Sequence, residues 1–236
     1  MIRAVLFDLD DTLFDHRTSA REALRAVHRG HGAELDFAAL ERHHAIHLEE
    51  MHLEVLAGRL GLDDARRERF RRVFLALGVT LDPAAVNAVA TAYRSGYMTS
   101  RRALAGAAAL LTEVRRRARI VIVTNNLLDE QQDKLQYCGL APLVDALVAS
   151  EDVGVSKPDP DIFRIALDRA GVSADEAVMV GDSWANDIAG ARNAGIRAVW
   201  FNPDRRPRPE EPPDVLEIDT LVPADVIAML LLDHRG

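Results

Sequence analysis

Short runs of apolar, often β-branched residues alternate along the chain with longer stretches that have helical spacing. The apolar runs are continuous, which is typical of parallel strands buried on both faces. Between them, residues 159–170 place Phe163, Ala166 and Leu167 on one helical face. This alternation predicts an α/β fold with a doubly wound parallel sheet. The predicted strands are Ala4–Phe7, Ile120–Val123, Ala146–Ala149, Ala177–Val180 and Ala198–Phe201.

The stretch from Asp15 to Ser100 has no convincing strand pattern. Residues 35–60 have the pattern of one long helix or a helix pair, and 64–77 are amphipathic and rich in arginine. Asp82 and Pro83 are suited to a helix N-cap and first turn. The sequence therefore predicts an all-helical domain, residues 15–100, inserted into an α/β core domain of residues 1–14 and 101–236.

A proline-rich segment follows the fifth predicted strand. Half of the ten prolines lie in Pro203–Pro213, which predicts an extended loop. A short strand-like segment, Val215–Ile218, and a helix from about Pro223 to Leu232 are expected after it.

Composition excludes several classes of protein. With 48% apolar and 28% charged residues, the chain is expected to be globular. Its single cysteine, Cys138, permits no internal disulfide. No apolar run reaches the roughly 18 residues of a membrane span, and acids follow the first apolar run directly, unlike a secretory signal. A net charge of −8 disfavours nucleic acid as a partner. We expect a cytoplasmic protein, with no membrane partner, that is a monomer or small homodimer.

Lysine is rare in this chain. Of the 29 basic residues, 27 are arginine and two are lysine. Lys157 lies in a loop after the third predicted strand. Lys134 lies in a predicted polar helix, and the sequence assigns it no role.

Polar residues follow four of the predicted strands. Each group alone has an ordinary explanation as a turn or a helix cap. Together they meet at one edge, because the carboxyl ends of parallel strands lie side by side. Four carboxylates and one ammonium require a further cation, and an oxygen-rich site of this charge fits Mg²⁺. The groups are Asp8 with Asp10, Thr124 with Asn125, Lys157, and Asp182 with Asp187.

These residues resemble the four motifs of the haloacid dehalogenase superfamily of phosphohydrolases. The motifs are Asp8-x-Asp10-x-Thr12, Thr124, Lys157 and Gly181-Asp182-x-x-x-Asn186-Asp187. The resemblance implies a Rossmann-like parallel sheet flanked by helices, and the helical insert resembles the superfamily's C1-type cap. The start of the chain and the cap length resemble a branch of small-metabolite phosphatases that includes pyrimidine 5'-nucleotidases and N-acylneuraminate-9-phosphatases.

The resemblance implies a phosphomonoesterase that forms an aspartyl-phosphate. Asp8 would be the nucleophile and Asp10 the general acid and base. Mg²⁺ would bind the carboxylates of Asp8 and Asp182 and the main-chain carbonyl of Asp10. The remaining roles implied are phosphate binding by Thr124, Asn125 and Lys157, bracing of the loop by Thr12, and orientation of Lys157 or a metal-bound water by Asp187.

Other chemistries of the superfamily are weighed on the same residues. Dehalogenation of haloacids needs neither a metal nor an acid and base two residues after the nucleophile. The presence of Asp10 and of Asp182 with Asp187 therefore argues against it. Phosphonoacetaldehyde cleavage needs a cap lysine, and residues 15–100 contain none. A phosphomutase or phosphotransferase stays open, as does a non-catalytic binding protein. The expected substrate is a small phosphorylated metabolite, either a nucleoside monophosphate or a sugar phosphate.

Cap residues are expected to set specificity. Phe14 and His16, just after the first motif, are candidate substrate contacts. A group of histidines lies in one cap helix, and the pair His43 and His47, four residues apart, could bind a transition metal. No third ligand is obvious, and a polar face of the cap is the ordinary explanation. The group consists of His43, His44, His47 and His52.

Overall fold

The computed structural model describes residues 1–209 and 214–233. The chain divides into two compact units, one formed by Met1–Asp15 with Arg102–Gly236 and the other by His16–Arg101. Both divisions lie one residue beyond the boundaries expected from the sequence. The first unit is the α/β core and the second is the helical cap.

The core is built on a six-stranded parallel sheet with the strand order β3-β2-β1-β4-β5-β6. All five predicted strands are present, and the strand-like segment after the proline-rich loop forms the sixth. The first strand pairs with β2 on one side and β4 on the other, so the strand order reverses at β1. Open α/β sheets bind ligands at such a reversal. The strands are β1 (Ala4–Phe7), β2 (Arg119–Thr124), β3 (Ala146–Ala149), β4 (Ala177–Gly181), β5 (Arg197–Phe201) and β6 (Leu216–Ile218).

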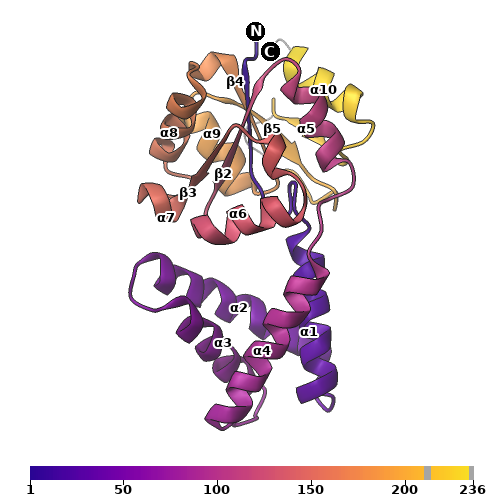
Figure 1. Ribbon diagram of the computed structural model, residues 1–236, viewed down its shortest axis with the longest axis vertical. Coiled ribbons are helices and arrows are strands. Elements are labelled where there is room, and N and C mark those ends of the chain that lie inside the picture. The colour runs from indigo at the N-terminus through magenta and orange to yellow at the C-terminus, as the bar shows by residue number, and fades with distance from the viewer. Residues whose placement is uncertain (210–213, 234–236) are drawn as a thin grey trace. The chain divides into compact units, whose positions relative to one another are not determined.

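Helices cover the sheet, which explains its continuously apolar strands (Figure 1). Leu6 and Val121 share a buried cluster with Phe163 of α8, and their neighbours point to the opposite face. On that side α5 packs against α10. The core helices are α5 (Ala107–Arg115), α6 (Leu128–Tyr137), α7 (Ser150–Val153), α8 (Pro160–Ala170), α9 (Gly190–Asn193) and α10 (Ala224–Asp233), with short turns η1 (Ala141–Leu143) and η2 (Ala174–Glu176) and the π-helix η3 (Trp184–Ala189).

The predicted proline-rich loop is only partly described. Residues 203–209 form neither helix nor strand, and residues 210–213 lie outside the described residues. None of the described helices is both long and apolar enough to cross a membrane.

The cap consists of helices throughout, as the sequence predicts. Asp82 caps α4 by accepting a hydrogen bond from the Ala85 N–H at 2.8 Å. The first helix begins at His16, and the Ser19 hydroxyl donates to the Ser100 carbonyl at 3.1 Å, which ties the two ends of the cap together. The cap helices are α1 (His16–His31), α2 (Phe37–Leu56), α3 (Leu62–Ala76) and α4 (Pro83–Ser100).

One cap histidine belongs to a buried aromatic cluster. The His44 ring lies 4.9 Å from the Tyr93 ring and 5.6 Å from the Phe70 ring, measured between centroids. Its Nε2 atom has no hydrogen-bond partner among the described residues. Burial, followed by the charges of Arg69, His16 and His47, holds the pKa of His44 well below its usual range. His44 therefore packs as a neutral ring within this cluster.

We expect the neutral state of His44 to make the cap sensitive to acid. Below about pH 6.5 His44 binds a proton in the unfolded chain but stays neutral in the folded chain. The free energy of unfolding therefore falls as the pH falls. Replacing His44 with Phe keeps an aromatic ring and should reduce the loss of stability between pH 7.5 and pH 5.5, by up to about 1.4 kcal/mol per pH unit. Urea unfolding at both pH values measures this. His43→Phe on the same helix is the control, and an identical pH dependence in both variants would contradict the assignment.

Candidate active site

The candidate site lies at the carboxyl end of β1, where the two neighbouring strands also end. The Asp8 N–H continues the sheet by donating to the Val180 carbonyl at 2.9 Å. Asp8 directly follows the last residue of β1, a fully buried strand, and this fixes the position of its carboxylate. Residues 9–14 then turn back tightly, since the N–H groups of Thr12, Leu13 and Phe14 all donate to the Leu9 carbonyl.

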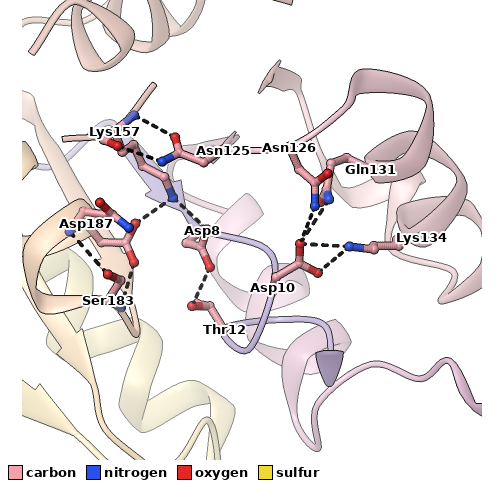
Figure 2. A network of polar contacts seen from close by, with 11 residues as sticks. Asp8, Asp10, Thr12, Asn125, Asn126, Gln131, Lys134, Lys157, Ser183 and Asp187 are labelled. Atoms are coloured by element: carbon pink, nitrogen blue, oxygen red, sulfur yellow. Dashed lines mark hydrogen bonds and ion pairs between the residues drawn. The ribbon is translucent and has the colours of Figure 1, made fainter. Parts of the chain in front are cut away.

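Asp8, Lys157 and Asp187 form a buried ionic cluster (Figure 2). The Lys157 Nζ lies 2.7 Å from Asp8 Oδ1 and 2.6 Å from Asp187 Oδ1. The Thr12 hydroxyl donates to the other Asp8 oxygen at 3.0 Å. Thr12 thus contacts the Asp8 carboxylate directly, in addition to shaping the loop.

The charges in this cluster do not balance. Burial is the largest influence on Asp8 and raises its pKa from 3.8 to about 8, with Lys157 opposing the rise and Asp187 and Asp182 adding to it. Burial alone would lower the pKa of Lys157, but Asp187 and Asp8 outweigh it and raise that pKa above its ordinary value. Lys157 therefore stays charged, and a single ammonium is shared between carboxylates that repel one another.

Asn125 holds Lys157 in place. Its side-chain amide donates to the Lys157 carbonyl at 2.7 Å, and its carbonyl oxygen accepts from the Lys157 N–H at 2.7 Å. The predicted role of Asn125 in phosphate binding stays a prediction; its side chain fixes the backbone of the lysine loop. Thr124 is buried at the end of β2, next in sequence to Asn125.

Asp187 is positioned by an unusual helical turn. The N–H groups of Asp187 and Ile188 both donate to the Ser183 carbonyl, at 2.8 and 3.3 Å, in a π-helical turn of the kind frequent at functional sites. The Ser183 N–H in turn donates to Asp187 Oδ2 at 2.9 Å. The Asp187 carboxylate packs so closely on Gly181 that a Cβ there would overlap it. The glycine of the fourth motif is thus required by packing.

A candidate metal centre is formed by Asp8, Asp182 and Asp187. Each offers a carboxylate oxygen, and these atoms lie within 4.8 Å of one another. The Asp182 backbone is held by Trp200 and Arg206, which donate to its carbonyl at 3.0 and 2.7 Å. The set fits a hard divalent cation, because added positive charge would offset the burial and repulsion that raise the pKa of Asp8. No group of cap histidines meets the same criterion among the described residues.

Asp10 belongs to a separate network, which includes Lys134, a residue to which the sequence assigned no role. The Lys134 ammonium lies 2.6 and 2.8 Å from the two Asp10 oxygens, and its side chain is only 5% exposed. Asn126 and Gln131 donate to Asp10 Oδ2 at 3.2 and 3.1 Å. Figure 2 shows the Asp10 carboxylate turned away from Asp8 and towards α6. The sequence predicted a polar helix here, and in the structure Gln131 of that helix is fully buried.

The two candidate substrate contacts after the first motif differ in their surroundings. Phe14 is fully buried, and the Lys134 Nζ lies 5.1 Å from the centroid of its ring, so its side chain packs inside the core. His16 begins α1, and its Nδ1 is 2.9 Å from the Tyr97 hydroxyl. Tyr93 and Tyr97 are both buried, as a helix core would require.

Comparison of the chain with known proteins leads to the same family as the four motifs. The profile of the haloacid dehalogenase-like hydrolases matches residues 2–195, which is most of the chain. The chain belongs to this family. The family resemblance drawn from the four motifs is therefore confirmed, and so is the Rossmann-like fold with helices on the sheet.

Relatives in the family include enzymes named as phosphatases. A glyceraldehyde 3-phosphate phosphatase of Methanopyrus kandleri is 32% identical over 93% of this chain and 94% of its own length. A phosphoserine phosphatase of Thermus thermophilus is 48% identical, but the match spans 45% of this chain and 42% of that enzyme. Among solved structures, the putative hydrolase YfnB of Bacillus subtilis, bound to magnesium, matches with a TM-score of 0.76, 26% identity and 98% coverage of both chains.

Proposed function

We propose that this protein is a Mg²⁺-dependent phosphomonoesterase that acts through an aspartyl-phosphate intermediate. The observation that carries the proposal is the buried ionic cluster, in which one ammonium contacts both Asp8 and Asp187 within 2.7 Å. The proposed nucleophile, the Asp8 carboxylate, lies beside a fixed positive charge. Such an arrangement suits attack on phosphorus, because negative charge collects on the phosphoryl oxygens in the transition state.

Asp8 and Asp10 divide the chemistry between them. An Asp8 oxygen forms a bond to phosphorus as the bond from phosphorus to the ester oxygen breaks, and Asp10 gives its proton to that leaving oxygen. Asp10 then takes a proton from water, whose oxygen attacks phosphorus and releases phosphate from Asp8. The two networks described above support this division, since the two carboxylates have different partners.

The neighbouring residues hold the phosphoryl group and the nucleophile. Lys157 and the Thr124 hydroxyl bind the non-bridging oxygens, and the Thr12 hydroxyl orients Asp8. Asp187 keeps Lys157 in position through its own ion pair with the ammonium. Asn125 contributes by fixing the Lys157 backbone.

A magnesium ion would be held by the carboxylates of Asp8 and Asp182 and by the Asp10 main-chain carbonyl. When bound, it supplies positive charge that neutralises the phosphoryl oxygens. The cluster of carboxylates from Asp8, Asp182 and Asp187 supports a cation at this position.

The proposed substrate is a small phosphorylated metabolite, a nucleoside monophosphate or a sugar phosphate. The support comes from relatives, which include a glyceraldehyde 3-phosphate phosphatase that matches almost the whole chain and a pyrimidine 5'-nucleotidase that matches 45% of it. A panel of phosphorylated metabolites, scored by phosphate release, identifies the substrate class.

Metal removal tests the proposed reaction. We expect the purified chain to release phosphate from p-nitrophenyl phosphate in the presence of Mg²⁺, and EDTA to lower the rate at least about tenfold. Adding excess Mg²⁺ should restore it, which serves as the control. Full activity in EDTA would contradict the metal assignment. Phosphoryl transfer to an added sugar without release of phosphate would indicate a mutase instead.

A further inference from the structure

Both lysines of this chain contact the Asp-x-Asp motif. In a chain with 27 arginines, Lys157 pairs with Asp8 and Lys134 pairs with Asp10. Both lysine side chains are at most 5% exposed. Arginine makes up all the other Lys and Arg residues of the chain, so the use of lysine at both contacts departs from its composition. This shared pattern indicates that Lys134, like Lys157, serves the reacting carboxylates.

The partners of Asp10 form a built receptor for a carboxylate. Lys134 donates to both oxygens, and Asn126 and Gln131 add bonds to Oδ2. Gln131 and Lys134 are three residues apart, so they share a face of α6. The Asp10 side chain is 22% exposed, which leaves one side of it accessible.

The buried ammonium of Lys134 has Asp10 as its charged partner. Its ammonium lies over the Phe14 ring, four residues beyond Asp10 in the same loop. A cation that is almost wholly removed from water requires a charged partner or a hydrogen-bonded one. Asp10 supplies both, through two bonds shorter than 2.9 Å.

We propose that Lys134 is a positioning residue for the acid and base of the reaction. With Gln131 and Asn126, it binds the Asp10 carboxylate from α6 and so limits the orientations from which Asp10 exchanges protons with the leaving oxygen and with water. In this proposal Lys134 acts through Asp10, to which it is bonded. The inference rests on the proposed phosphatase function and extends it to a residue outside the four motifs.

A pair of substrates with different leaving groups tests this role. Glycerol phosphate needs a proton on its leaving oxygen, whereas nitrophenolate leaves without one. We expect Lys134→Met to lower kcat for glycerol phosphate about 10- to 100-fold, with KM changed less than about threefold. The single-turnover release of nitrophenolate from p-nitrophenyl phosphate should stay within about threefold of the wild type. Lys134→Arg, which keeps the charge, should recover part of the loss.

Matched variants separate positioning from a structural role. Gln131→Leu should weaken turnover of glycerol phosphate, whereas Gln132→Leu, at the exposed neighbouring position, should not. In an Asp10→Asn background, Lys134→Met should cost little further activity, because the carboxylate that it orients is gone. Thermal unfolding of each variant shows whether it is folded.

Two results would overturn the inference. One is an equal loss by Lys134→Met on both substrates in single turnover, and the other is an undiminished loss in the Asp10→Asn background. Failure of the proposed function looks different, because the wild-type chain would then release phosphate from neither substrate, and the inference would fall with it.

Discussion

Replacing Asp8 with Asn is expected to abolish turnover, with a fall in kcat of about 10⁴-fold or more. The change removes the attacking oxygen's charge while keeping the side chain's size. The carboxamide keeps one oxygen for the Thr12 hydroxyl, so the loop geometry should survive. Phosphate release from p-nitrophenyl phosphate measures the loss, and trapping of radiolabelled phosphoenzyme, present in the wild type and absent in the variant, tests the intermediate.

Stability is the control for this variant. Burial and the nearby carboxylates raise the pKa of Asp8, so its ionised form is unfavourable in the metal-free protein. Asp8→Asn should therefore unfold at a temperature no lower than the wild type when both are measured in EDTA. Turnover near the wild-type rate in a folded variant would remove Asp8 from the role of nucleophile.

Replacing Lys157 with Arg is expected to lower kcat about 100- to 1,000-fold, even though the charge is kept. The ammonium contacts Asp8 and Asp187 at 2.7 and 2.6 Å in a buried site. A planar guanidinium is larger and cannot occupy that point without moving one of the carboxylates. Steady-state kinetics with p-nitrophenyl phosphate measures the effect.

An arginine exchange elsewhere supplies the comparison. Lys134→Arg, in the more exposed pair with Asp10, should lose far less activity towards p-nitrophenyl phosphate than Lys157→Arg. Equal effects of the two exchanges would show that Lys157 has no special place at the phosphoryl group. Circular dichroism of both variants confirms that each is folded.

Much of the core could be predicted because its signals are local. Five continuous apolar runs identified buried parallel strands, and every one is present within about a residue of its expected bounds. Parallel strands end at one edge, so residues following them had to meet there. Asp8, Lys157 and Asp187 do so within hydrogen-bonding distance. The signal for the helical insert was also local, because a long stretch with helical spacing and no strand pattern is expected to form helices.

Other features depend on contacts that no local pattern encodes. Asn125 looked like a phosphate ligand because of its place after β2, but its amide is used on the Lys157 backbone, 32 residues away. Phe14 looked accessible because it follows the first motif, yet the turn after β1 buries it. Arg206 reaches Asp182 from the proline-rich loop, where the sequence predicted no functional residue.

The two lysines divide what the sequence determined from what only the tertiary structure decided. Composition marked both as rare, and the strand-end rule placed Lys157 at the site. Lys134 lies in the middle of a helix whose sequence is polar on most sides, so no periodicity revealed that this face is buried. Its partner Asp10 is 124 residues away, and only the packing of α6 beside the first loop brings the ammonium to that carboxylate. The sequence thus determined the strands, the motifs that follow them and the acid-rich edge of the sheet. The pairing of each carboxylate with its own lysine depends on side-chain packing between segments that are far apart in the chain.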